Sequence, residues 1–190
     1  MSRQVQCAST FRSTVISFVS AALLALWVGN ATAQTATQSP ASIGNAREKI
    51  VGVWRLESFV EQRPNGDVVP SGRYGPNVAG MIVYDQSGAM MAQLMNPDRP
   101  KFAATNATRG TPEEVKSAFD GYNAYYGTYS VDVATATIQH RVEGNLFPNL
   151  VGTDFKRTFK FADDKLILEL PPAQIQGEQR IVRLVWRKVS

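Results

Sequence analysis

Arg157 is an unexpected charged residue on a strand face that is otherwise apolar. It alternates with Phe155 and Phe159, while the positions between them carry charged or hydroxyl side chains. A guanidinium that is buried without an anion costs several kcal/mol, so an inward-facing Arg157 needs a partner. In the functional interpretation, the acidic group of a ligand pairs with Arg157. In the structural interpretation, Arg157 forms an ion pair within the protein, or its side chain reaches back to water.

His140 is a second polar residue on an apolar face, between Ile138 and Val142, and the chain has no other histidine. A histidine in this position can exchange a proton, anchor a ligand or bind haem iron axially. The alternative is a neutral core histidine that is hydrogen-bonded to a tyrosine or to the backbone. The only cysteine, Cys7, lies in the predicted signal peptide described below, so the mature chain has one histidine and no cysteine, too few for a typical zinc site, and we expect no metal and no cofactor.

Aromatic residues near these two positions predict the walls of a pocket. The tyrosines between 122 and 129 either line a binding mouth or pack a helix onto the sheet. The loop 96–108 is long for a compact barrel and is a candidate lid. The candidate ligand-binding residues are Arg157, His140, Tyr125, Tyr129, Trp54, Phe155 and Tyr122, with Arg99 and Phe102 from the loop.

The elements that must position these residues are strands, because the dominant hydrophobic period from Ile50 onward is two. The expected strands cover residues 51–60, 80–85, 89–95, 125–132, 135–143, 154–161, 165–170 and 180–189. Eight short strands, mostly linked as hairpins, predict a closed all-β antiparallel barrel, because closure removes exposed sheet edges.

One helix is expected to interrupt the strands. Thr111 is a good N-cap, Pro112 suits the first helical position, and Glu114 completes a capping box. Apolar side chains then fall on one face at helical spacing, namely Val115, Ala118, Phe119 and Tyr122. We expect this short helix to pack on the barrel or across one end of it.

The first 33 residues have the layout of a secretory signal peptide. Arg3 and Arg12 precede 14 uncharged, mostly apolar residues (15–28), which is short for a membrane span, and Ala33 ends a small-x-small cleavage signal. The predicted organisation is a signal peptide (1–33), a flexible leader (34–48) and one barrel domain (49–190). Cleavage after Ala33 would place the mature protein in the periplasm or outside the cell.

Charge excludes several classes of partner. Without the two signal-peptide arginines, the 20 Lys and Arg fall to 18 against 16 Asp and Glu, so the net charge falls from +4 to +2. This balance does not favour nucleic acid or an anionic membrane surface. The expected partner is a small hydrophobic or amphipathic molecule, with no nucleic acid and no integral membrane segment in the mature chain. The oligomeric state stays open.

The chain resembles the bacterial lipocalin-like domain family of small barrel proteins. Gly52-Val53-Trp54 matches the Gly-x-Trp signature of lipocalins, and residues 93–100, 110–114, 140–149, 152–153 and 183–187 strengthen the match. The resemblance covers about residues 50–188 and implies a lipocalin-like barrel of eight to ten strands with a small-molecule pocket. It also implies that an arginine of the last strand, Arg183 or Arg187, packs over Trp54. It implies no reaction.

Three functions remain open at this point. The first is an exported barrel that binds a small, largely apolar ligand with a polar or acidic group. The second is a barrel enzyme of isomerase, cyclase or hydrolase type, with His140 as general acid/base. The third is a solid-core barrel that binds a partner protein through Val53 and Phe59 on the outer face of the first strand. No nucleophile elbow, phosphate loop or paired-carboxylate motif is present in the sequence, which favours binding over catalysis.

Overall fold

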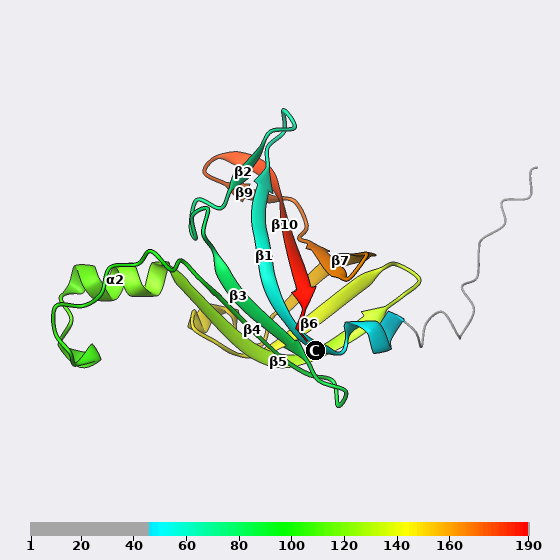
Figure 1. Ribbon diagram of the computed structural model, residues 1–190, viewed down its shortest axis with the longest axis horizontal. Coiled ribbons are helices and arrows are strands. Elements are labelled where there is room, and N and C mark those ends of the chain that lie inside the picture. The colour runs from blue at the N-terminus through cyan, green and yellow to red at the C-terminus, as the bar shows by residue number, and fades with distance from the viewer. Residues whose placement is uncertain (1–45, 190) are drawn as a thin grey trace, which may run out of the picture. The chain divides into compact units, whose positions relative to one another are not determined.

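Ten antiparallel strands form one sheet, and eight of them close it into a barrel (Figure 1). The computed structural model describes residues 46–189, apart from the side chain of Ala107. The strands are β1 (Gly52–Gln62), β2 (Val68–Pro70), β3 (Ala79–Tyr84), β4 (Ala89–Met95), β5 (Tyr122–Asp132), β6 (Thr137–Asn145), β7 (Asp154–Ala162), β8 (Lys165–Glu169), β9 (Ala173–Ile175) and β10 (Glu178–Lys188). The sheet closes because β1 pairs with β10 as well as with β3. The predicted antiparallel barrel is confirmed, and β2 and β9 extend it at one end.

A β-bulge in β1 changes which side chains face the barrel interior. The register of β1 against β10 shifts between Leu56 and Ser58, which inserts one extra residue into the strand. Trp54 and Leu56 are buried before the bulge, whereas Glu61 is the buried position after it, and Phe59 packs against the core. The prediction that Phe59 faces outward is therefore wrong, because a strict period of two does not continue through an extra residue.

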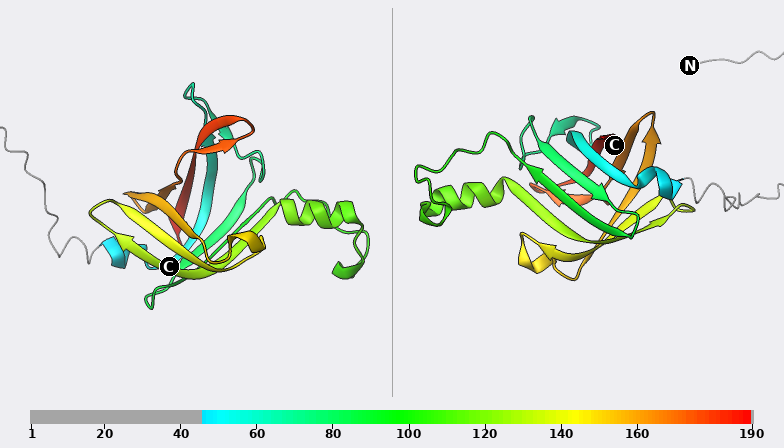
Figure 2. Two further views of the ribbon diagram at one scale, coloured as in Figure 1. Left: turned by 180° about the vertical axis from the view of Figure 1, so that it is seen from behind. Right: turned by 60° about the horizontal axis from the view of Figure 1, so that its bottom comes forward.

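The start of β1 and the end of β10 meet at a closed end of the barrel (Figure 2). Residues 46–50 are helical there, and Trp54 Nε1 donates a 2.8 Å hydrogen bond to the carbonyl of Ile50, which is fully buried. The cation over the Trp54 ring is Lys188, 5.2 Å from the ring centroid, and not Arg183 or Arg187 as expected. The even-numbered side chains of β10 face the barrel interior, and Lys188 is one of this set. Arg183 and Arg187 are odd-numbered, point outward and form ion pairs.

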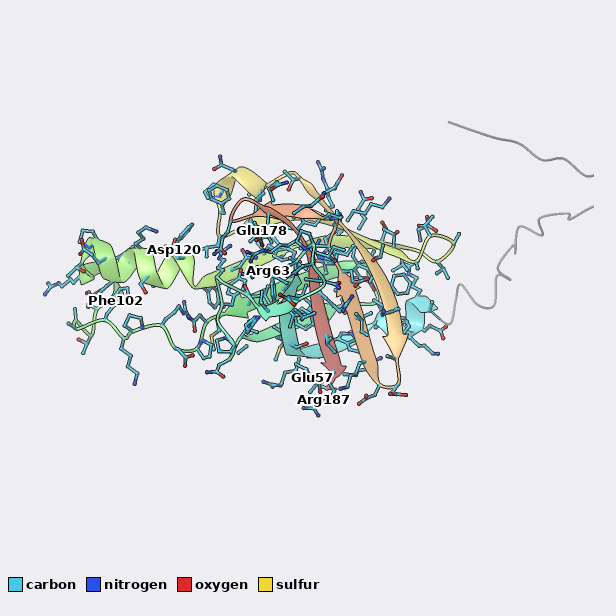
Figure 3. All side chains as sticks on the ribbon, turned by 90° about the horizontal axis from the view of Figure 1, so that it is seen from above. Glu57, Arg63, Phe102, Asp120, Glu178 and Arg187 are labelled. Carbon is cyan, nitrogen blue, oxygen red and sulfur yellow. The ribbon has the colours of Figure 1, made fainter. Side chains whose placement is uncertain are left out.

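The helix α2 (Pro112–Asp120) has the predicted Thr111 capping box and the predicted proline in its first turn. None of its residues is buried. The expectation that its apolar face packs on the sheet is therefore wrong. Instead α2 extends beyond the N-terminal end of β5 and lies beside the loop that precedes the helix (Figures 1 and 3). Arg99 Nη1 donates to the carbonyl of Ala118 at 2.9 Å, which ties this loop to the helix. Two short 3₁₀ turns, η1 (Ala107–Arg109) and η2 (Pro148–Leu150), complete the described elements.

The predicted signal peptide (1–33) lies outside the described residues, as does the predicted leader up to residue 45. Within residues 46–189, no helix is both long and apolar enough to cross a membrane.

Candidate functional site

A cavity of about 710 Å³ occupies the barrel interior. Its wall is largely apolar and includes Phe59, Leu94, Phe155, Leu168, Leu184 and Trp186. This volume lies within the range of about 300–1,000 Å³ that small-molecule sites occupy. The interior is therefore not the solid core that the partner-binding alternative predicted.

Arg157 lies in the cavity wall at the point where β7 separates from β8. The β7–β8 ladder begins only at Thr158, so residues 154–157 of β7 pair with β6 alone. The guanidinium carbon lies 5.1 Å from the centroid of the Phe155 ring. No residue that the structure describes forms an ion pair or a hydrogen bond with the side chain of Arg157. The side chain is half-buried and thus presents a positive charge without a counter-ion to a largely apolar cavity.

His140 lies beneath the cavity and does not border it. Its side chain is fully buried; the Tyr84 hydroxyl lies 2.8 Å from Nε2 and the Tyr125 hydroxyl lies 3.1 Å from Nδ1. Burial, and then the charge of Arg157, hold the pKa of His140 well below its usual value, so the imidazole is neutral at neutral pH. This geometry matches the alternative of a neutral core histidine bonded to tyrosine. Axial ligation of haem iron would require the loss of one of these hydrogen bonds.

The tyrosines at this end of the cavity are neutral donors. Burial raises the pKa of the hydroxyls of Tyr74, Tyr84 and Tyr125, most strongly for Tyr84, so all three stay protonated. The charge of Arg157 opposes this rise in pKa at Tyr84 and Tyr125.

Tyr74 is a cavity residue that the sequence analysis missed. It is 4% exposed, its ring packs edge-on against Phe59 at 5.4 Å, and it borders the cavity. Among the described residues, nothing hydrogen-bonds to its hydroxyl. Tyr74 belongs to the turn 71–75, where no hydrophobic period marks inward positions; the two flanking glycines were the only local signal.

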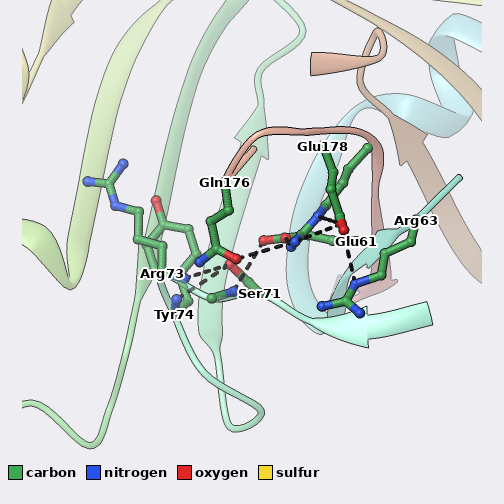
Figure 4. A network of polar contacts seen from close by, with 9 residues as sticks. Glu61, Arg63, Ser71, Arg73, Tyr74, Gln176 and Glu178 are labelled. Carbon is green, nitrogen blue, oxygen red and sulfur yellow. Dashed lines mark hydrogen bonds and ion pairs between the residues drawn. The ribbon is translucent and has the colours of Figure 1, made fainter. Parts of the chain in front are cut away.

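A buried polar network lies at the end of the barrel that carries β2 and β9 (Figure 4). Arg180 Nη1 donates to Glu61 Oε2 at 2.7 Å, and both side chains are about 96% buried. Glu61 Oε1 also accepts from the backbone N–H of Gly72 at 3.2 Å, while Arg180 additionally contacts Gln176 and Glu178. Glu61 and Gln176 border the cavity, so this network forms part of its wall. It was not predicted, because the expected first strand ended at residue 60 and the bulge shifts the inward positions beyond Leu56.

Comparison with known proteins agrees with this architecture. A model of the lipocalin-like domain matches residues 51–189. The chain belongs to the lipocalin-like domain family. A curated relative of this lipocalin-like protein is the 4'-hydroxy-3'-methoxypropiophenone carrier protein of Aspergillus oryzae, 36% identical over 109 residues that cover 53% of this chain and 96% of the relative.

Solved structures resemble this lipocalin-like protein more distantly. A lipocalin-like protein of Bacteroides uniformis is 15% identical, with 74% of this chain and 98% of the other covered and a TM-score of 0.38. A protein of Bacteroides eggerthii is 16% identical, with 73% and 98% covered and a TM-score of 0.36.

The structure brings three of the predicted ligand-binding residues of this lipocalin-like protein to the cavity, namely Arg157, Tyr125 and Phe155. The others lie elsewhere. Tyr129 is buried and donates to the carbonyl of Asp85 at 2.9 Å, and Trp54 is at the closed end. Tyr122 bonds Gln93 at 2.6 Å and lies beneath the guanidinium of Arg99. Phe102 lies against Gly110 in the loop beside α2 (Figure 3). A role for these residues in ligand binding stays a prediction. Among the described residues no three His, Cys, Asp or Glu side chains cluster as a metal site would require.

Proposed function

We propose that this lipocalin-like protein binds and carries a small, largely apolar molecule with one polar or acidic group. The observation that carries the proposal is Arg157, which borders an apolar cavity and has no counter-ion among the described residues. A ligand that supplies an acidic or strongly accepting oxygen would compensate this charge, and the aromatic and aliphatic wall would bury the rest of the molecule.

The curated relative supports the same class of ligand. The molecule in its name, 4'-hydroxy-3'-methoxypropiophenone, is an aromatic ketone with a short alkyl chain and one phenol. It combines a mainly apolar body with a polar end, which is what the cavity of this chain presents. It is therefore the first probe to use.

Tryptophan fluorescence tests the proposal, because Trp186 borders the cavity and Trp54 does not. We expect the ketone to quench the purified protein in a saturable titration. Trp54→Phe should keep this response, and Trp186→Phe should abolish the optical change. Native mass spectrometry after purification should also detect any small molecule that the protein retains. If no molecule is retained, and neither the ketone nor a lipophilic fluorophore binds, the proposal is wrong.

We also propose that the protein is exported, with residues 1–33 as its signal peptide. The support is the charged start, the short apolar run and the small-x-small signal before Gln34. Intact-mass measurement of protein from a culture of the native host should give a chain that begins at Gln34, in the periplasmic or external fraction. A full-length chain confined to the cytoplasm would contradict this.

A further inference from the structure

Hydrogen bonds link the buried side chains of Tyr84, His140 and Tyr125 into a chain. This chain determines whether the Tyr125 hydroxyl, which borders the cavity, acts as a donor or as an acceptor. A neutral imidazole has one N–H, so one of the two tyrosines donates to His140 and the other accepts from it. Tyr84 is 1% exposed and has no second partner among the described residues. If Tyr84 accepted from Nε2, its own proton would be buried without an acceptor, at a cost of about 1–3 kcal/mol.

The hydrogen bonds between Tyr84, His140 and Tyr125 therefore have one favoured donor-to-acceptor order. Tyr84 donates to Nε2, Nδ1–H donates to the Tyr125 oxygen, and the Tyr125 proton remains available for another acceptor. Tyr125 borders the cavity, so that acceptor is a molecule inside it. Each bond in such a chain polarises the next, which strengthens Tyr125 as a donor.

Two further groups of the cavity wall favour an oxygen anion. Arg157 and Tyr125 border the same cavity and lie against the same ring: the Phe155 centroid is 5.1 Å from the guanidinium carbon and 5.4 Å from the centroid of Tyr125. The Tyr74 hydroxyl, 4% exposed and without a described partner, borders the same cavity. The carboxylate of Glu61 also borders the cavity, but its charge is matched by Arg180. Arg73 and Lys156 border the cavity too and form no ion pair with any described residue, whereas Asp154 pairs with Arg141. The polar lining thus combines positive charges that lack a counter-ion with hydrogen-bond donors.

We infer that the cavity holds the acidic oxygen of its ligand in the deprotonated form, with Arg157 and the Tyr125 O–H as donors and Tyr74 beside them. This inference rests on the proposed function and narrows the class of preferred ligand to anions, so neutral molecules are not expected to be preferred. A phenolate and a carboxylate present the same chemistry here. On binding, the ligand gives its proton to the solvent, and the oxygen accepts hydrogen bonds from the two donors.

The ketone probe reports its own protonation state. Its phenol is para to the carbonyl, which delocalises the charge of the phenolate, so the phenol is unusually acidic and its absorption shifts to longer wavelength on ionisation. We expect the bound ketone to show the phenolate band at a pH where the free ketone is neutral. Affinity should fall on the order of tenfold per pH unit below the pKa of the free phenol.

Three compounds separate the sources of the anion. The ketone supplies a phenolate, 4-methoxybenzoate supplies a carboxylate, and 3',4'-dimethoxypropiophenone has no acidic group. Binding of the ketone as phenolate, or binding of 4-methoxybenzoate, with at least about tenfold weaker binding of the dimethoxy compound, supports the inference.

Matched variants test the donors. Arg157→Met should lower the affinity for the anionic compounds about tenfold or more and remove the phenolate band, and Tyr125→Phe should have a smaller effect of the same kind. Lys160→Met is the control, because it removes one positive charge from the exposed face of the same strand, β7. Thermal unfolding of each variant without ligand verifies that the barrel is folded, and Arg157→Lys preserves the charge if Arg157→Met does not fold.

The outcomes separate this inference from the proposed function. If the ketone binds with its neutral spectrum, and the dimethoxy compound binds as tightly as either acid, the protein is a carrier but the inference is wrong. If none of the three compounds binds and the protein retains no molecule, the proposed function is wrong as well.

Discussion

His140 influences the cavity through the Tyr125 hydroxyl and does not touch the cavity itself. The imidazole is fully buried, and both of its nitrogens are satisfied by Tyr84 and Tyr125. A polar residue in an apolar core is tolerated when all its hydrogen bonds are made, and it then specifies one arrangement of its neighbours. Sequence analysis identified this residue as exceptional, but the period of a strand does not show what lies on the opposite wall of a barrel.

The pH dependence of stability should show that His140 is buried in its neutral form. The unfolded chain binds a proton at His140 below a pKa of about 6.5, whereas burial keeps the folded pKa well below that value. Stability is therefore fully present above pH 6.5 or so and is lost as the pH falls, by up to about 1.4 kcal/mol per pH unit. Urea unfolding between about pH 7.5 and 5 measures this slope. No other histidine is present in the chain, so His140→Asn should remove it; a flat wild-type profile would contradict the prediction.

Tyr84→Phe should reveal the chain of hydrogen bonds without altering the cavity wall. It leaves His140 Nε2 without a donor in the core, and we expect a loss of about 1–3 kcal/mol in the free energy of unfolding. Nδ1 of the imidazole can then accept a hydrogen bond from the Tyr125 hydroxyl, which should also weaken binding of an anionic ligand. Tyr126→Phe is the control, since Tyr126 is 58% exposed, and it should change stability by less than about 0.5 kcal/mol. Equal effects of the two substitutions in denaturant titrations would refute this interpretation.

At the scale of elements, regular patterns predicted the strands and helix well, and one irregularity limited what could be predicted about the site. The eight barrel strands followed from period-two hydrophobicity, and the N-terminus of α2 followed from Thr111 and Glu114. The bulge after Leu56 has no marker in the sequence, because it arises from pairing with β10. As a result Phe59 was placed on the wrong face, Glu61 was not identified as a buried residue, and Tyr74, in a turn without periodicity, was missed.

The polar network beside β2 and β9 should control the stability of that end of the barrel. Glu61→Gln removes the buried one of the two carboxylates that pair with Arg180, leaves the half-exposed Glu178 as its remaining counter-ion, and should cost about 1.5–3 kcal/mol. Hydrogen exchange should accelerate most in residues 68–75 and 173–180. The matched control is Glu169→Gln, whose pair with Arg183 is about one-third exposed and should contribute less than about 1 kcal/mol. Similar losses in both variants would show that burial of the pair does not matter.

At the scale of the whole molecule, a ligand that binds only the folded barrel must raise its stability. The gain is about 2.7 kcal/mol at a ligand concentration about 100 times Kd, which raises Tm by roughly 2–4 °C for each kcal/mol. The shift should be measured by scanning calorimetry with the ketone, and it should shrink in Arg157→Met at the same ligand concentration. An unchanged Tm at saturating ligand would mean that binding does not involve the folded cavity.

The bulge in β1 also affects how this barrel should be compared with, or rebuilt from, its relatives. An alignment anchored on Gly52-Val53-Trp54 assigns inward and outward positions correctly as far as Leu56. Beyond that residue, grafting pocket side chains from a barrel with an unbroken first strand would place them on the outer surface, unless the numbering is offset by one. A redesign of ligand specificity that ignored this offset would alter the surface of the protein while leaving Phe59 and Glu61 in the cavity wall unchanged.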